Sequence, residues 1–250
     1  MSSTPGLEGR VALVTGAARR VGAEIATQLH AAGADVGIHY RHSADDAAEL
    51  VARLNGLRPD SATLFQADLL DTASIPALVA AVTGWRGGID ILVNNASTFY
   101  PTPLGEITEA DWDDLVGSNF KAPLFLAQAA AASLRERGGN IVNIVDTHAQ
   151  RPLRNHLVYS PAKAGLAMLT RALARELAPD VRVNGVSPGA ILWPETDMNE
   201  ETKASILDEV PLARAGSPAD IAGCVVYLVR DATYVTGQIV AVDGGRSIGW

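Results

Sequence analysis

The sequence contains one spacing of reactive side chains that suits proton transfer, in the segment Tyr159-Ser160-Pro161-Ala162-Lys163. A tyrosine and a lysine four positions apart lie on the same face of a helix. A nearby ammonium group lowers the pKa of a phenol toward neutrality, so that the phenol can serve as a proton donor. A group that accepts a hydride needs such a donor, because its heteroatom gains negative charge. The pair therefore predicts acid catalysis in a reduction.

A turn with glycines follows the first apolar run, in residues 15–22 (TGAARRVG). Glycines at such a turn allow backbone N–H groups and the N-terminus of the next helix to face a pyrophosphate. Arg19 and Arg20 would stand in the first turn of that helix, where the macrodipole disfavours a cation by about 0.3–1 kcal/mol. A bound polyanion would offset this cost. We interpret the turn as a phosphate site; a tight strand-to-helix turn without a ligand is the alternative.

The end of the second apolar run carries polar residues, in the segment 39–43 (HYRHS). Enzymes that bind NAD usually place an acidic residue here to hold the ribose 2′-hydroxyl, whereas a basic residue accommodates the 2′-phosphate of NADP. The first acid after this segment is Asp45, and Arg41, His42 and Ser43 offer donors and positive charge instead. The segment favours NADPH as the cofactor, with a solvated polar loop as the alternative.

Apolar segments and helical patterns alternate along the chain. The runs that predict buried strands, the third of them weaker, are Val11–Val14, Val36–Ile38, Thr63–Gln66, Ile89–Val93, Ile141–Val145, Val181–Val186 and Ile239–Val242. The segments with helical spacing include Val21–Ala32, Ala44–Leu54, Trp112–Leu134 and Ser160–Leu177. Continuous apolar runs suit strands buried on both faces. The alternation predicts an α/β fold: a doubly wound Rossmann-like domain with a central parallel sheet of about seven strands flanked by helices.

Two segments interrupt this alternation, at residues 97–106 and 190–211. The first carries two prolines and the second has weak periodicity. Both follow predicted strands, so they are expected at the carboxyl edge of the sheet, where open α/β sheets bind ligands. Long irregular segments in compact domains are usually functional. Because no linker, repeat or low-complexity tract occurs, we expect residues 1–250 to form one domain.

Composition excludes several other classes of protein. The net charge of −8 argues against a nucleic-acid partner, and the apolar runs are shorter than the roughly 20 residues of a membrane span. Without a secretory signal pattern, we expect a cytoplasmic protein. The single cysteine, Cys224, is expected to be a packed thiol. His148 and His156 lack metal-ligand spacing with other groups, so we expect surface histidines and no metal site.

These motifs, with four others, follow the order found in short-chain dehydrogenases/reductases. The others are Asn94-Asn95-Ala96, Asn119, Ser187-Pro188-Gly189 and Val242-Asp243-Gly244-Gly245, and the chain resembles that family over nearly its whole length. The resemblance implies that Tyr159 protonates the substrate, that Lys163 holds the nicotinamide ribose and tunes Tyr159, and that Asn119 orders a water for proton relay. It also implies that the Pro-Gly pair 188–189 faces the nicotinamide, and it favours a homotetramer.

One position departs from the family, because Asp146 stands thirteen residues before Tyr159, where the family has its catalytic serine. A serine hydroxyl suits a ketone oxygen. An ionised carboxylate would oppose a developing oxyanion and would raise the pKa of the neighbouring phenol. A protonated carboxyl, however, is a capable acid for a nitrogen. The substitution therefore favours reduction of C=N over C=O.

The combination of Arg20, residues 39–40 (HY), residues 95–103 (NASTFYPTP) and Asp146 resembles the pteridine reductase subgroup, and residues 188–195 (PGAILWPE) resemble its bacterial members. The resemblance implies that Phe99 stacks on a pterin opposite the nicotinamide. The residues implied to contact the pterin are Arg20, Ser97, Phe99, Asp146, Tyr159 and Trp193. Phe99 as a core anchor, and Trp193 as packing alone, are the alternatives.

The cofactor set follows from the motifs and the resemblance together. The residues expected to bind NADPH are Gly16, Arg19, Arg20, Val21, Gly22, Tyr40, Arg41, His42, Ser43, Asp68, Asn95, Ala96, Ser97, Tyr159, Lys163, Pro188 and Gly189. Two assignments stay open. Either Arg41 or His42 meets the 2′-phosphate, and Asp68 either contacts adenine or caps the following helix.

The sequence thus predicts an enzyme that transfers a hydride from NADPH to a ring carbon of a pterin, with protonation of the adjacent nitrogen. The catalytic residues would be Asp146, Tyr159, Lys163 and Asn119. A carbonyl reductase of the same family, acting on a 3-oxoacyl group or a sugar, is the first alternative. A non-catalytic NADP(H)-binding regulator is the second. The pattern does not choose among dihydrobiopterin, dihydromonapterin, dihydrofolate and oxidised pterins.

Overall fold

Seven strands form one parallel sheet in the computed structural model, which describes residues 6–191 and 199–248. Their order across the sheet is β3-β2-β1-β4-β5-β6-β7, and each neighbouring pair is parallel. The strands are β1 (Val11–Val14), β2 (Asp35–Tyr40), β3 (Ala62–Gln66), β4 (Ile91–Asn94), β5 (Asn140–Ile144), β6 (Arg182–Pro188) and β7 (Ile239–Val242). The predicted doubly wound fold is confirmed, including the weaker third strand.

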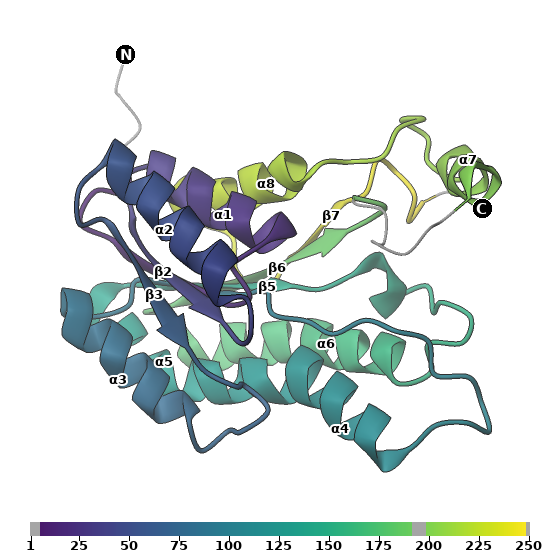
Figure 1. The fold of residues 1–250 in the computed structure, drawn as a ribbon, viewed down its shortest axis with the longest axis horizontal. Coiled ribbons are helices and arrows are strands. Elements are labelled where there is room, and N and C mark those ends of the chain that lie inside the picture. Colours follow the sequence, from purple (N-terminus) through teal and green to yellow (C-terminus); the bar gives the residue numbers. More distant parts are fainter. Residues whose placement is uncertain (1–5, 192–198, 249–250) are drawn as a thin grey trace.

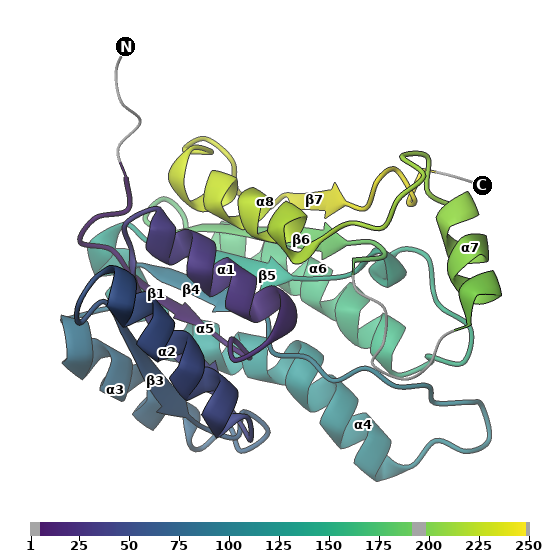
Figure 2. The same cartoon turned by 45° about the horizontal axis from the view of Figure 1, so that its top comes forward.

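Helices cover both faces of this sheet (Figure 1). One layer holds α1 (Arg20–Ala31), α2 (Ala44–Leu57) and α8 (Pro218–Arg230), and Figure 2 shows α1 and α8 side by side above the strands. The opposite layer holds α3 (Ile75–Arg86), α4 (Glu109–Val116), α5 (Ala122–Arg137) and α6 (Tyr159–Leu177). None of the helices within the described residues is long and apolar enough to cross a membrane.

The two layers explain why β1 is apolar at every position. In β1, Ala12 and Val14 belong to the core under α1, α2 and α8, whereas Val11 and Leu13 belong to the core on the other face. Alternate side chains of a strand point to opposite faces, so a strand covered on both sides needs apolar residues throughout. Cys224 of α8 packs partly buried against the first core, and burial raises the pKa of its thiol to about 11.

The predicted helix Trp112–Leu134 has an irregular middle. It begins at Glu109 as α4, passes through a π-helical turn η1 (Gly117–Lys121) and continues as α5. Such turns insert one extra residue into a helix and occur often at functional sites. Asn119 lies within η1 and is buried.

From its weak periodicity, the segment 190–211 is expected to be irregular, but part of it forms a helix. It contains α7 (Glu200–Asp208), whose side chains are all exposed or half-buried. A helix without a buried face has no apolar periodicity to reveal it. In Figure 1, α7 lies apart from the two helix layers.

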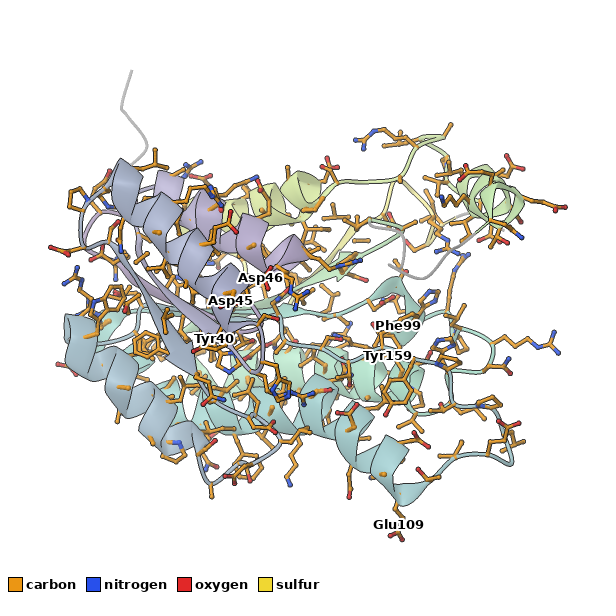
Figure 3. The ribbon with its side chains drawn as sticks, viewed as in Figure 1. Tyr40, Asp45, Asp46, Phe99, Glu109 and Tyr159 are labelled. Atoms are coloured by element: carbon orange, nitrogen blue, oxygen red, sulfur yellow. The ribbon has the colours of Figure 1, made fainter. Side chains whose placement is uncertain are left out.

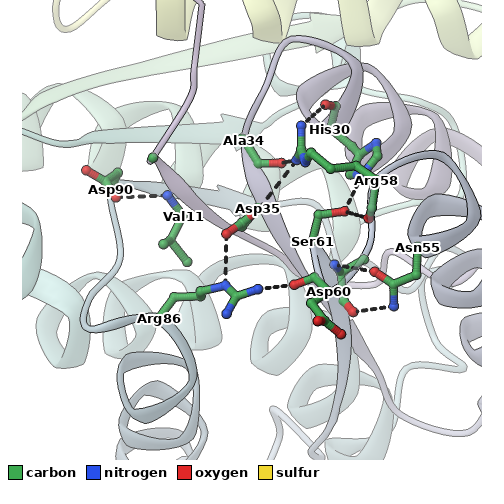
Figure 4. Close-up of polar contacts among 12 residues, drawn as sticks. Val11, His30, Ala34, Asp35, Asn55, Arg58, Asp60, Ser61, Arg86 and Asp90 are labelled. Atoms are coloured by element: carbon green, nitrogen blue, oxygen red, sulfur yellow. Dashed lines mark hydrogen bonds and ion pairs between the residues drawn. The ribbon is translucent and has the colours of Figure 1, made fainter.

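A polar network closes the amino edge of the sheet (Figure 4). Asp35 at the start of β2 accepts a hydrogen bond from Arg86 of α3 at 2.8 Å and contacts Arg58 at 3.5 Å. Asp90, before β4, accepts the N–H of Val11 at 2.8 Å. These contacts fix the amino ends of β1, β2 and β4. The carboxyl ends lie at the opposite edge of the sheet, where a ligand is expected to bind.

Candidate active site

The glycine turn after β1 is held by the end of β4. Asn95 and Ala96 donate their backbone N–H groups to the Thr15 hydroxyl at 2.9 and 3.0 Å, and the Asn95 amide donates to the Gly16 carbonyl at 3.0 Å. Gly16 has a φ of 59°, and a Cβ there would lie 2.9 Å from Cα of Ala96. Only glycine fits this position, so the turn keeps its backbone close to the end of β4.

His39 supports the same turn and was missed by the sequence analysis. Its Nδ1 accepts the N–H of Gly16 at 3.1 Å, and its Nε2 donates to the Ala67 carbonyl at 3.2 Å. Burial lowers the pKa of His39 to about 4, which keeps the ring neutral and able to accept. The available signal was a histidine inside an apolar run, because a buried polar group needs partners. Tyr40, the neighbouring residue that the sequence predicts to bind NADPH, packs against the core under α1.

A cavity of about 400 Å³ opens between this turn and the ends of β2, β3 and β4. Its wall contains three arginines, and it includes the N-terminus of α1. The residues that line it are Gly16, Arg19, Arg20, Val21, Gly22, His39, Arg41, Asp68, Leu69, Leu70, Asn95, Ala96, Ser97, Thr98 and Ser118. A helix N-terminus with added cations suits phosphate groups. The cavity therefore fits the phosphate-bearing part of a nicotinamide dinucleotide.

Positive charge gathers where β2 ends. Arg41 lines the cavity and lies 3.8 Å from the Asp68 carboxylate, whereas His42 is exposed outside the cavity. Arg19 donates to the Ser43 hydroxyl at 3.1 Å. Of the two candidates for the 2′-phosphate, Arg41 is therefore the one that faces the cavity.

Asp68 does not cap the following helix. Its carboxylate accepts the N–H of Leu70 at 3.0 Å within a turn, and the residue before α3 is Ser74. The carboxylate faces the cavity beside Arg41. The helix-cap alternative is therefore wrong.

Arg20 adopts a backbone conformation that favours glycine. It is the first residue of α1 and has a φ of 54°. A side chain in the left-handed region costs about 1–2 kcal/mol. Backbone strain of this kind persists at sites where function requires the residue. Arg20 stands where the family pattern has its middle glycine, and it lines the cavity.

The proton-transfer groups lie where β5 ends and α6 begins. The Tyr159 hydroxyl donates to Oδ2 of Asp146 at 2.6 Å. Oδ1 of Asp146 accepts the N–H of His148 at 2.7 Å. Lys163 donates through Nζ to the Ile144 carbonyl at 2.8 Å, with Nζ 5.8 Å from the centre of the Tyr159 ring. The three side chains that the sequence selected are thus neighbours, and all three come from β5–α6.

The acid strengths of this group differ from the sequence expectation. Burial raises the pKa of Tyr159 well above its ordinary value, and the charge and hydrogen bond of Asp146 raise it further. The lowering expected from Lys163 is not found, because Lys163 is not among the groups that shift the pKa of Tyr159. Burial lowers the pKa of Lys163 to about 8, with Asp146 opposing that shift. The phenol is therefore protonated in this arrangement, and its proton is directed at the carboxylate.

Asn119 reaches this group through Ser97. The π-helical turn presents the Asn119 side chain, whose Oδ1 accepts from the Ser97 hydroxyl at 2.7 Å and whose Nδ2 donates to the Thr98 carbonyl at 2.9 Å. Ser97 also lowers the pKa of Tyr159, against the larger opposing effects of burial and of Asp146. Ser97 lines the cavity as well, so this residue joins the cavity to the proton-transfer group.

Phe99 and His156 form an aromatic cluster with Tyr159. The Phe99 ring stacks on His156, with centroids 4.7 Å apart and planes at 18°, and meets Tyr159 edge-on at 4.8 Å. Figure 3 shows Phe99 and Tyr159 together. Phe99 is 49% exposed, so the core-anchor alternative is wrong. His156 is not a surface histidine, because it is half-buried and its Nε2 is buried.

The remaining predicted residues lie outside the cavity or outside the described residues. Pro188 ends β6, and Gly189 donates its N–H to the Val242 carbonyl at 3.1 Å, beside the start of the C-terminal segment. Trp193 lies outside the described residues.

Comparison with known proteins identifies the family. A family model described as enoyl-(acyl carrier protein) reductase matches residues 16–247. The chain belongs to the short-chain dehydrogenase/reductase family. As a member of that family, it is an NAD(P)-dependent reductase.

Individual relatives carry two different activities in their names. Pteridine reductase 1 of Leishmania tarentolae is 42% identical, across 95% of this chain and 96% of its own length. A 3-oxoacyl-[acyl-carrier-protein] reductase of Staphylococcus aureus is 37% identical, across 94% of this chain and 96% of its own length. A similar solved structure is that of a blue fluorescent protein from a metagenomic library in complex with NADPH, with a TM-score of 0.91, 36% identity and coverage of 96% of this chain and 99% of that one.

Proposed function

We propose that this short-chain dehydrogenase/reductase reduces a pterin with NADPH, transferring a hydride to a ring carbon while the adjacent nitrogen receives a proton. The observation that carries the proposal is the 2.6 Å hydrogen bond from Tyr159 to Asp146. Carbonyl-reducing members of the family have a serine at this position. A carboxyl group that shares a proton with the phenol suits a basic ring nitrogen better than a developing oxyanion.

NADPH, when bound, supplies the hydride. The three arginines of the cavity wall would hold its phosphate groups, with Arg41 and Arg19 nearest the end of β2. Each charge-assisted hydrogen bond contributes about 1.5–3 kcal/mol, which favours NADPH over NADH by tenfold or more. Lys163 and the Pro-Gly pair 188–189 would hold the nicotinamide half.

Proton transfer uses one connected group. The Tyr159 hydroxyl and the Asp146 carboxyl share one proton, which one of them delivers to the substrate nitrogen. Lys163, with its pKa lowered to about 8 by burial, stands near enough to stabilise the resulting negative charge. Ser97 and Asn119 would lead a replacement proton back toward Tyr159 from the cavity side. One hydride and one proton are consumed in each turnover.

Substrate binding would use Phe99. Its half-exposed ring lies edge-on to Tyr159, so a flat ring stacked on it would lie close to the phenol. An aromatic pair contributes about 0.5–1.5 kcal/mol beyond its buried area. Stacking would also orient the reacting carbon, which is a large part of catalysis by proximity.

A 3-oxoacyl reductase is the second candidate, because a relative named for that activity is 37% identical. A panel of substrates separates the two. We expect kcat/KM with NADPH to be at least 10²-fold higher for 7,8-dihydropterins than for a 3-oxoacyl thioester. The opposite preference would reject the pterin assignment. Failure to oxidise NADPH with any member of the panel would favour a non-catalytic NADP(H)-binding protein.

A further inference from the structure

The side chain of His156 takes part in no step described above, yet it lies within the aromatic cluster. Its ring is stacked on Phe99, and its centroid is 6.4 Å from that of Tyr159. The backbone fixes this position from two sides. Thr102 forms a parallel bridge with His156 and donates its N–H to the Asn155 carbonyl at 2.5 Å. The segment that carries Phe99 and the segment that carries His156 are therefore joined.

One ring nitrogen of His156 has its partner, which defines the chemistry of the other. Nδ1 lies 2.8 Å from the Arg154 carbonyl oxygen. A carbonyl oxygen can only accept, so Nδ1 carries the proton. In the neutral ring Nε2 is then an acceptor. It is buried and has no hydrogen-bond partner among the described residues.

A buried acceptor without a partner destabilises the arrangement in which it is found. Phe99 covers one face of the imidazole and is itself half exposed, so its ring can shift without disturbing either core. A flat substrate that inserts beside Phe99 would move this ring. A substrate that also brings a donor to Nε2 would satisfy the nitrogen. A substrate without a donor would leave Nε2 of His156 without a hydrogen-bond partner.

We propose that His156 is a specificity residue, whose Nε2 accepts a hydrogen bond from an N–H or O–H group of the substrate held against Phe99. The inference rests on the proposed function and adds a reason for it. Pterins carry ring N–H and amino donors and, in some cases, a hydroxylated side chain, whereas a 3-oxoacyl chain offers no donor near its ketone. His156 thus selects donor-bearing flat substrates.

The test uses the full-length enzyme, NADPH and three substrates. The first, 7,8-dihydrobiopterin, has ring N–H groups and side-chain hydroxyls. The second, 6-methyl-7,8-dihydropterin, has ring donors alone. The third, 9,10-phenanthrenequinone, is flat and has no donor. The variants are His156→Phe, which keeps a stacked ring but loses the acceptor, and His156→Gln, which keeps an acceptor but loses the ring.

We expect His156→Phe to raise KM about tenfold for the donor-bearing substrates, with kcat nearly unchanged and the quinone affected less than twofold. An increase for both dihydropterins assigns the donor to the ring, and an increase for dihydrobiopterin alone assigns it to the hydroxyls. His156→Gln should recover part of the KM. Leu157→Phe is the matched control, because it places the same phenyl ring at the next position of the loop, which is 48% exposed and outside the aromatic cluster, and it should leave all three KM values unchanged.

The proposal is overturned if His156→Phe changes all three KM values equally, which is the result for a ring that only packs. It is also overturned if KM falls for all three, which is the result for an imidazole that only competes with substrate. If His156→Phe keeps the parental KM and kcat with both dihydropterins, the role of His156 is rejected while the proposed function stands. If the parent enzyme reduces the quinone but no dihydropterin, the proposed function fails and this inference fails with it.

Discussion

Asp146 performs two roles that a single substitution can separate. Its Oδ1 accepts the N–H of His148, whereas its Oδ2 accepts the phenol proton of Tyr159. Asn in place of Asp keeps an oxygen for the backbone N–H, but its amide nitrogen is a donor and cannot accept the phenol proton. This position is therefore suited to a test that leaves the local backbone unchanged.

We expect Asp146→Asn to lower kcat for dihydropterin on the order of 10²-fold while NADPH affinity stays at the parental value. Asp146→Ser should lose the same activity and gain reduction of a simple diketone. Both variants would be assayed with both substrates from pH 5 to 8. A parental rate for Asp146→Asn across that range would make Asp146 a structural residue and remove the main support for the pterin assignment.

Arg20 has an unfavourable backbone φ angle and carries a positive charge in the cavity wall. Because its φ is 54°, Arg20→Gly should increase the free energy of unfolding by about 1 kcal/mol. The same substitution removes a cation from the cavity wall, so NADPH affinity should fall about tenfold or more. Urea unfolding and fluorescence titration with NADPH measure the two effects.

Arg20→Ala is the control, since alanine loses the charge but keeps the strain. It should weaken NADPH binding as much as glycine does, without the gain in stability. If Arg20→Gly binds NADPH as tightly as the parent, the strained arginine serves no purpose in cofactor binding.

Two residues of the site, His39 and His156, were not chosen from the sequence, each for its own physical reason. His39 and Tyr40 are neighbours in one strand, and alternation sends one to the cavity and the other to the core. Strand alternation alone does not decide which, because both faces of β2 are covered, and the need of a buried histidine for hydrogen-bond partners is the one signal that favours His39. His156 joins Phe99 only through a backbone bridge between loops, at a separation that no local pattern reveals.

At the scale of elements, the contact between β2 and the glycine turn depends on neutral His39, which accepts the Gly16 N–H. The pKa of His39 is lowered to about 4 from an ordinary value of 6.5, so the folded protein binds a proton less readily than the unfolded chain. The stability that depends on neutral His39 is complete above pH 6.5 and is lost as pH falls toward 4, by at most about 1.4 kcal/mol per pH unit. Protonation also removes the acceptor for the Gly16 N–H.

His39→Asn should reduce this acid sensitivity, because the amide oxygen can replace Nδ1 and does not titrate. We expect the variant to lose less unfolding free energy than the parent between pH 6.5 and 5, measured by urea denaturation. Part of the slope should remain, since burial also lowers the pKa of His30. Identical slopes for the variant and the parent would exclude His39 as a source of the acid sensitivity.

The strands were predicted because burial on both faces leaves an apolar signature, and α1, α2, α4, α5 and α6 were predicted from helical spacing, whereas α3 and α8 were not among the predicted segments. The predicted bounds of β1 and β7 match the structure, and those of the other strands shift by one or two residues. The helix α7 was missed because its side chains are not buried. The π-helical turn was missed because η1 absorbs its extra residue within five positions, so helical spacing continues on both sides of it.

At the scale of the whole molecule, the cavity is lined by residues at the ends of four strands (β1, β2, β3 and β4), from α1 and from η1, so cofactor binding should stabilise the entire fold. A ligand at 100 times its Kd adds about 2.7 kcal/mol, which raises Tm by about 5–11 °C for a domain of this size. We expect NADPH to produce this shift in a thermal melt.

Arg41→Ser provides the comparison. It removes the cation that faces the cavity at the end of β2, so the Tm shift caused by NADPH should fall while the shift caused by NADH stays the same. An equal decrease in the Tm shifts caused by NADPH and by NADH would mean that Arg41 recognises a part of the cofactor that both share.

The π-helical turn between α4 and α5 also bears on how such a site can arise. An α-helix repeats every 3.6 residues, so adding one residue rotates all that follows by about 100°. The turn η1 confines that rotation to five residues, Gly117–Lys121, and α5 still buries its apolar side chains against the sheet. Asn119 therefore occupies a place that a regular helix would not provide. The π-helical turn thus holds a polar group in the interior, while α5 keeps its apolar side chains in the core.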